Sequence, residues 1–291
     1  MTSGSGLDDV LRELRFGAPA ASSGAGRDRS ERSQDNRFGF VIDFDSPQTW
    51  PDVAYDTAAP SARHDAPGRA RSLAALDEAA ETMARRVPAA WRLVDEQLQR
   101  VLLRSDAGVP GGSASHRLHV GACLLTNLHQ PSEATLVAIE ALTHEATHQL
   151  LYRMEEAHGH VCDLAPLPTY RSPWSGARLP LHSLVHASFV WFGLLALWAE
   201  LGRQPASAGE ATHARARVAH CLFGFAFLED LLSSPVFASA KIDPQALAAM
   251  RGMSTAAGAA TRAAEPFASL REVASARQQA GWMAAIASAL G

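Results

Sequence analysis

The chain has few cysteines and almost no lysine. Its three cysteines, Cys123, Cys162 and Cys221, lie far apart, and no Cys-x-x-Cys pair occurs. This argues against a disulfide framework and against a thiolate metal site, and it favours a reducing cytoplasm as the compartment. Lys241 is the only lysine, so arginine supplies the other basic charges.

The chain also lacks a basic surface and a secretory signal. The formal net charge is -4 at pH 7, and the arginines are scattered, which argues against a nucleic-acid partner. The amino terminus carries Gly, Ser, Asp and Arg where a secretory signal needs an apolar run. The most apolar stretch, residues 179–201, has the length of a membrane span, but His182, His186 and Glu200 within it favour a core helix.

Helical periodicity dominates what is present. Hydrophobic residues make up 47% of the chain and charged residues 19%, which is enough to bury a sizeable core. Apolar positions at helical spacing predict one or two helices over residues 72–103, with Pro88 as a break or kink. Further helices are predicted over residues 132–158, 181–201, 209–233, 244–253 and 264–290.

Strands and irregular chain account for less of the sequence. Residues 38–44 and 116–127 are rich in strand formers. Residues 1–37 combine a short amphipathic start with a tract of Ser, Gly, Ala, Arg and Asp, which predicts a disordered arm. The predicted fold class is mainly α with a small β component (α+β), as a single helical domain over residues 38–291.

The central feature is an HExxH motif over residues 144–148, inside the predicted helix 132–158. Positions i and i+4 share one face of a helix, so His144 and His148 can bind a single metal ion with Glu145 beside them. The motif follows a predicted strand and has apolar neighbours, which favours a metal centre over two solvated histidines.

The third protein ligand decides the class of reaction. A metzincin has Gly three residues and His six residues after the second motif histidine, and this chain has Leu151 and Met154 there. A carboxylate from a later helix, Glu200 or Glu229, would instead give a zinc peptidase. In that enzyme Glu145 would be the general base for a zinc-bound water.

The competing third ligand is His186, in the predicted helix that follows a connection rich in Gly and Pro. The residues around His186 and those of the HExxH motif match the sequence pattern of one family, in the same order along the chain. The matching residues are Gly121, Ala122, Leu124, Asn127, the run 144–152, the run 172–174, Arg178, Pro180, the run 184–187, Phe189 and Phe192. This stretch, about residues 120–201, resembles the HExxH-type peptide β-hydroxylases, which use iron(II) and 2-oxoglutarate to hydroxylate ribosomally made peptides.

The resemblance implies that His144, His148 and His186 are iron ligands and that Arg178 pairs with an acidic group. Three neutral imidazoles on one face of iron(II) leave three positions open, enough for a bidentate 2-oxo acid and dioxygen. A guanidinium can bind the distal carboxylate of 2-oxoglutarate through two parallel hydrogen bonds. Arg171 is the alternative to Arg178 for that role.

Three functions stay open at this level. The leading hypothesis is an iron(II)- and 2-oxoglutarate-dependent oxygenase that hydroxylates the β-carbon of a side chain in a precursor peptide, with Glu145 orienting a ligand or a water. The second is a zinc metallopeptidase with Glu145 as base, and the third is a non-catalytic helical binding protein. His182, one turn before His186, is either a further ligand or a donor that positions one.

Overall fold

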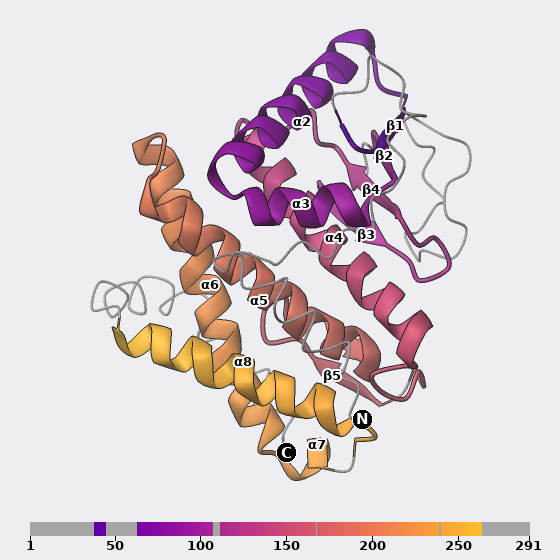
Figure 1. Ribbon diagram of the computed structural model, residues 1–291, viewed down its shortest axis with the longest axis vertical. Helices are drawn as coiled ribbons and strands as arrows, with labels where there is room; N and C mark the ends of the chain where they lie inside the picture. Colours follow the sequence, from indigo (N-terminus) through magenta and orange to yellow (C-terminus); the bar gives the residue numbers. More distant parts are fainter. Residues whose placement is uncertain (1–37, 45–62, 107–110, 167, 239, 264–291) are drawn as a thin grey trace, which may run out of the picture. The chain divides into compact units, whose positions relative to one another are not determined.

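The computed structural model describes residues 38–44, 63–106, 111–166, 168–238 and 240–263 (Figure 1). Its mainly helical content with two small sheets confirms the predicted fold class. The chain divides into two compact units, which we call the amino-terminal unit, up to Arg153, and the carboxyl-terminal unit, from Met154 onward. That they form one domain stays a prediction, and the expected arm over residues 1–37 lies outside the described residues.

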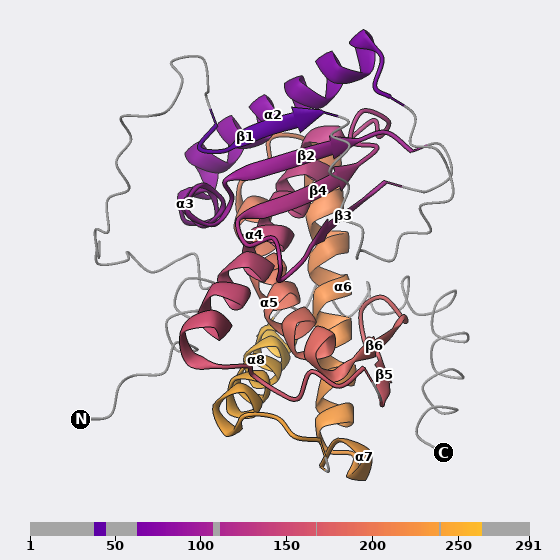
Figure 2. The same cartoon turned by 90° about the vertical axis from the view of Figure 1, so that its right-hand side faces the viewer.

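A four-stranded sheet forms the centre of the amino-terminal unit. The strands lie in the order β1 (Val41–Phe44), β2 (Arg100–Arg104), β4 (Ala122–Thr126) and β3 (Gly112–Ser115) (Figure 2). The first three are parallel, whereas β3 runs antiparallel along β4 at the edge of the sheet. The two interior strands are almost wholly buried, as is usual for parallel strands that are covered on both faces.

Three helices accompany this sheet. The helix α2 (Ala66–Arg86) begins at Asp65, whose carboxylate accepts a hydrogen bond from the amide of Gly68 at 2.7 Å. The helix α3 (Pro88–Gln97) starts at the proline that the sequence marked as a break. The helix α4 (Ala134–His158) matches the predicted motif helix and contributes its last turn to the carboxyl-terminal unit.

Two predictions were wrong in this part of the chain. The helix predicted to continue to residue 103 ends at Gln97, and β2 follows, because a short apolar run fits a buried strand as well as a helix. The strand predicted over residues 116–127 is confined to β4, and the preceding residues contain the edge strand β3, which the sequence did not predict.

The carboxyl-terminal unit is a small hairpin followed by packed helices. The strands β5 (Thr169–Arg171) and β6 (Arg178–Pro180) pair antiparallel within the connection that was predicted to be a loop. The helices that follow pack against one another (Figure 1). They are α5 (Leu181–Arg203), α6 (Ala208–Leu232), the single turn α7 (Pro235–Ala238) and α8 (Pro244–Ala263). The helix α8 runs ten residues beyond its predicted end, and the helix predicted over 264–290 lies outside the described residues.

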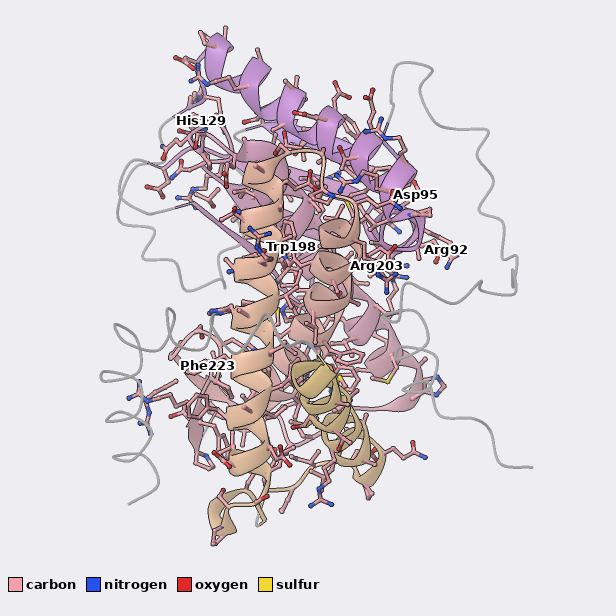
Figure 3. The ribbon with its side chains drawn as sticks, turned by 90° about the vertical axis from the view of Figure 1, so that its left-hand side faces the viewer. Arg92, Asp95, His129, Trp198, Arg203 and Phe223 are labelled. Atoms are coloured by element: carbon pink, nitrogen blue, oxygen red, sulfur yellow. The ribbon has the colours of Figure 1, made fainter. Side chains whose placement is uncertain are left out.

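The apolar helix α5 forms the core of this unit. Trp198 is fully buried on α5, and its ring lies 4.8 Å from that of His213 on α6 (Figure 3). By length and composition α5 is apolar enough to cross a membrane, yet 67% of its most apolar window is buried within the protein. This burial agrees with the prediction of a core helix.

Candidate metal centres

The two motif histidines lie side by side on α4, in the amino-terminal unit. Their ring centroids are 5.0 Å apart, as expected for positions one helical turn apart. The side chain of His144 is 30% exposed, so an ion or a small molecule can reach it. The ring of His148 stacks on that of Tyr152, with centroids 6.0 Å apart. The pair therefore offers two imidazoles on one accessible helix face.

Glu145 is buried beside the first motif histidine. Its carboxylate is buried, and the hydroxyl of Ser113 on β3 donates to Oε1 at 2.5 Å. The same oxygen lies 3.8 Å from Nε2 of His144. The second oxygen, Oε2, is buried and has no hydrogen-bond partner among the described residues. Burial, reinforced by the nearby charge of Glu145, raises the pKa of the Cys123 thiol well above its usual range.

Gln149 fixes the motif helix against the sheet. Its Oε1 accepts from the amide of Gly121 at 2.7 Å, and its Nε2 donates to the carbonyl of Ala122 at 2.9 Å. Gly121 has φ 89°, a left-handed conformation that favours glycine. The sequence assigned no role to either residue: Ser113 belongs to no recognisable motif, and Gln149 was noted only as part of the run 144–152. Together they hold the HExxH segment in one place relative to β3 and β4.

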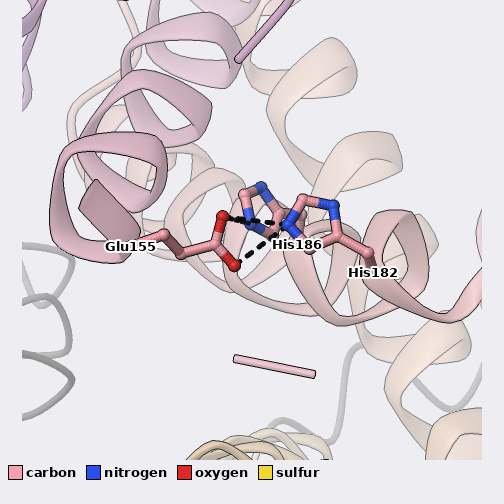
Figure 4. A group of neighbouring side chains, drawn as sticks. All are labelled: Glu155, His182 and His186. Atoms are coloured by element: carbon pink, nitrogen blue, oxygen red, sulfur yellow. Dashed lines mark hydrogen bonds and ion pairs between the residues drawn. The ribbon is translucent and has the colours of Figure 1, made fainter. Parts of the chain in front are cut away.

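The carboxyl-terminal unit contains a second group of metal-binding side chains: Glu155, His182 and His186 (Figure 4). Nε2 of His182 lies 2.9 Å from both carboxylate oxygens of Glu155, and Nε2 of His186 lies 3.4 Å from Oε2. The nearest ligand atoms of the three residues all fall within 4.8 Å of one another. We call this group the Glu-His-His cluster.

The Glu-His-His cluster is buried and electrostatically coupled. Burial acts to raise the pKa of Glu155, but the hydrogen bonds and charges of His182 and His186 outweigh burial and hold that pKa well below its usual range. Burial lowers the pKa of His186, although its hydrogen bond to Glu155 opposes the shift. At neutral pH the cluster therefore contains an ionised carboxylate and a neutral imidazole at position 186, the forms in which these groups bind metals.

The two arginines predicted to bind a carboxylate are neighbours. Arg171 and Arg178 occupy directly paired positions of β5 and β6, so their side chains leave the hairpin on the same face. Nη1 of Arg171 donates to the carbonyl of Gly176 at 2.9 Å, while its Nε is buried without a partner among the described residues. Nε of Arg178 donates to the hydroxyl of Thr169 at 3.1 Å, and the side chain is exposed.

The predicted ligands fall into both units. His144 and His148 come together on α4, whereas His186 belongs to the carboxyl-terminal unit and contacts Glu155. The three-histidine centre therefore stays a prediction. Glu200, a candidate carboxylate ligand for zinc, is engaged in an ion pair with Arg203.

Sequence reasoning missed Glu155, although one signal was present. It lies in the same predicted helix as the motif, and His182 had been noted as a residue one turn before His186. A carboxylate beside a pair of histidines at i and i+4 is a metal-binding pattern, but here the carboxylate comes from a different helix. The approach of Glu155 to His182 and His186 depends on how the last turn of α4 packs against α5 within the carboxyl-terminal unit, which the sequence alone does not show.

In comparisons with known proteins, no family model matches the chain and no curated protein matches it significantly.

Proposed function

We propose that the protein is an iron(II)- and 2-oxoglutarate-dependent oxygenase that hydroxylates the β-carbon of a side chain in a ribosomally made precursor peptide. The observation that carries this proposal is the state of Glu145. Its carboxylate is buried and accepts a hydrogen bond from Ser113 on β3, and the same oxygen lies 3.8 Å from Nε2 of His144. A carboxylate already engaged by a hydroxyl donor suits a residue that positions a metal ligand more than it suits a hydrolytic base.

In this proposal His144 and His148 hold the metal, with His186 as the predicted third ligand. The donor set fits iron(II), because imidazole nitrogens are favourable ligands for it and three such ligands leave positions free. When bound, iron with 2-oxoglutarate supplies the oxygen-activating chemistry. Glu145, anchored by Ser113 and 3.8 Å from Nε2 of His144, keeps the first motif ring in position.

The paired arginines supply the other requirement, which is recognition of a dicarboxylic co-substrate. A guanidinium binds a carboxylate through two parallel hydrogen bonds. Arg171 and Arg178 occupy paired positions in the hairpin. Nε of Arg171 has no hydrogen-bond partner among the described residues, so it can donate a hydrogen bond to a ligand. Their common face is therefore the proposed site for the distal carboxylate of 2-oxoglutarate.

The edge strand β3 suits a peptide substrate. It ends the sheet, and its outer edge has no strand partner in the part of the chain that the structure describes. An extended peptide can add to such an edge by backbone hydrogen bonds. Ser113 lies on this strand and contacts Glu145, so a peptide along β3 would run beside the motif.

A zinc peptidase is the second candidate, and one observation favours it. Oε2 of Glu145 is buried and lacks a hydrogen-bond partner among the described residues, as a carboxylate would if it accepted a proton from a metal-bound water. In this alternative His144 and His148 bind zinc, and Ser113 orients the carboxylate so that Oε2 is available.

A spectroscopic experiment separates the two candidates. The purified protein is mixed with iron(II) and 2-oxoglutarate without oxygen, and the weak visible charge-transfer band of the chelate is measured. We expect the band in the wild type and in the control H158A, whose histidine is exposed on the same helix, and its loss in H144A and H148A. Stoichiometric zinc, cleavage of peptides and no band would overturn the oxygenase proposal.

The variant E145Q then tests the role of the glutamate. In the oxygenase it should weaken iron binding by about 10–100-fold but recover most of the activity when iron is saturating, because the residue only positions His144. In a peptidase the loss of a general base costs about 10²–10⁴-fold in turnover. The measurement is product formation by mass spectrometry at saturating metal.

A further inference from the structure

The strongest feature outside the HExxH motif is the Glu-His-His cluster. Two of its members, His182 and His186, stand one turn apart on α5, and their ring centroids are only 4.2 Å apart. The third, Glu155, comes from the last turn of α4 and directs its carboxylate at both rings (Figure 4). Three side chains from two helices thus converge on one point inside the carboxyl-terminal unit.

We propose that Glu155, His182 and His186 bind a divalent first-row transition-metal ion, at a site that needs neither motif histidine. This inference goes beyond the proposed function, because it adds a metal site within the carboxyl-terminal unit. It also competes with that function for His186, since an ion held by Glu155 and His182 would use the imidazole that is the predicted third ligand of the motif centre. His144 and His148 would then take their third ligand from another residue.

The distances within the cluster agree with those around a metal ion. Zinc and similar ions bind imidazole nitrogen and carboxylate oxygen at about 2.0–2.2 Å. Neighbouring ligand atoms are then about 3.0 Å apart in an octahedral site and about 3.4 Å apart in a tetrahedral one. The observed separations from Nε2 of His182 and His186 to the Glu155 oxygens are 2.9 and 3.4 Å. All three ligand atoms lie within 4.8 Å of one another, so side-chain shifts that draw the two histidine nitrogens together would complete the geometry around an ion.

The burial of the ligands and the hydrogen bond that holds Glu155 also favour a metal site. Glu155 and His186 are almost wholly buried, and the side chain of His182 is 14% exposed, so the cluster keeps some contact with solvent. The amide of Val161 donates to Oε1 of Glu155 at 3.1 Å and so fixes the carboxylate. Such outer hydrogen bonds orient ligands for a metal.

The charge balance of the cluster also favours a cation. Within the described residues, the ion-pair partners of Glu155 are histidines, namely His160, His182 and His186, and no arginine or lysine contacts it. Glu155 is a buried carboxylate, and buried charges in proteins are paired or bind metals. A divalent ion would compensate this charge.

The donor set defines the class of ion. Two imidazoles and one carboxylate suit iron(II), zinc, cobalt(II) or manganese(II), and they leave coordination positions free for water or a small ligand. Calcium and magnesium prefer oxygen ligands and are not expected. The site would therefore hold an exchangeable ion with an open position.

The test uses a chain that cannot bind metal at the motif. In the double variant H144A/H148A, cobalt(II) is titrated and followed by its visible absorption, and bound metal is counted by elemental analysis. We expect one equivalent of cobalt, because the cluster is intact. A double variant that binds no cobalt overturns the inference.

Matched substitutions in that background identify the ligands. E155Q keeps the size of the side chain but removes its charge, and H182A removes one imidazole; each should weaken cobalt binding by about 100-fold or more, since even changes around the ligands cost 10–100-fold. H158A is the control, because His158 is exposed on α4 and lies outside the cluster. It should change affinity less than threefold.

The remaining outcomes are equally decisive. Unchanged cobalt binding in E155Q and H182A would overturn the inference, provided that circular dichroism shows both variants folded. Failure of the proposed function is seen separately, as absence of peptide hydroxylation by the wild type. A wild type without hydroxylation whose H144A/H148A variant keeps one equivalent of cobalt supports this inference alone.

Discussion

At the scale of single residues, two serines of β3 differ in the hydrogen bonding of their hydroxyl groups. The hydroxyl of Ser113 donates to buried Glu145, whereas the hydroxyl of Ser115 is buried without a partner among the described residues. Removing one partner of a buried hydrogen bond leaves the other unsatisfied, which costs about 1–3 kcal/mol. We therefore predict that Ser113→Ala lowers the free energy of unfolding by that amount.

The matched control is Ser115→Ala on the same strand. It removes a hydroxyl that makes no hydrogen bond in the described structure, so the free energy of unfolding should stay the same or rise slightly. Urea denaturation of both variants measures the difference. Equal destabilisation by the two substitutions would contradict the contact between Ser113 and Glu145.

Cys162 leads to a prediction about alkaline pH. Burial, with the charges of Glu155 and Asp163, raises the pKa of this thiol from 9.0 to about 12 in the folded protein. Above pH 9 the unfolded chain loses this proton while the folded chain keeps it, so stability falls as pH rises between 9 and 12. Between pH 8 and pH 10 the thiol should lower the free energy of unfolding by about 1 kcal/mol.

The comparison that isolates this effect is wild type against Cys162→Ala. The variant lacks the thiol, so its stability should fall less steeply over the same pH interval. Chemical denaturation at several pH values gives both curves. Parallel curves would show that Cys162 titrates alike in the folded and unfolded chains.

At the scale of elements, the contact between α6 and the segment before β6 depends on one glycine. Nε1 of Trp174 donates to the carbonyl of Cys221 at 3.2 Å, and a Cβ placed on Gly224 would lie 2.0 Å from that nitrogen. The indole is buried and stacks on Trp191, so it cannot move aside. Gly224→Ala should therefore destabilise the protein by about 3 kcal/mol through overpacking.

Gly252 on α8 provides the control for this substitution. A Cβ there meets no atom within 4 Å, and the residue is exposed. Gly252→Ala should stabilise the helix by up to about 1 kcal/mol, because alanine has the higher helix propensity. Thermal denaturation should thus move in opposite directions for the two variants. A Gly224→Ala protein as stable as the wild type would rule out the close approach of the indole.

Elements with a long, regular pattern were predictable, and short ones were not. The helix α4 carries periodic apolar positions over its whole length, and α5 and α6 were predicted to within three residues at each end. In contrast, β2 is five residues of mostly apolar chain, for which periodicity does not separate strand from helix. The strand β3 is composed of Gly, Ser and Ala, which carry no strand signal, and it forms by pairing with β4.

The candidate sites show the same limit. His144 and His148 were predictable because their spacing follows from helix geometry alone. The pairing of Arg171 with Arg178 and the approach of Glu155 to His182 depend on a hairpin register and on helix packing, which local sequence does not encode. Arg171 and Arg178 are predicted as alternatives for one role, and the structure places them at directly paired positions of the hairpin.

At the scale of the whole molecule, metal binding should be visible as stability. An ion that binds only the folded chain adds about 2.7 kcal/mol to the free energy of unfolding when its free concentration is 100 times the dissociation constant. For a chain of this size such a gain raises the midpoint of thermal unfolding by about 5–10 °C. The shift needs no knowledge of the substrate.

The prediction is specific to the Glu-His-His cluster when the motif is disabled. In H144A/H148A, saturating cobalt(II) should still raise the unfolding midpoint by several degrees, and a chelator should reverse the rise. Adding E155Q to that chain should abolish the shift, because Glu155 supplies the only carboxylate of the cluster. H158A, whose histidine is exposed and outside the cluster, should leave the shift intact. Since the shift reports binding and not turnover, it stands whether the bound ion serves catalysis or only holds α4 and α5 together, and a shift that survives E155Q would place the ion elsewhere.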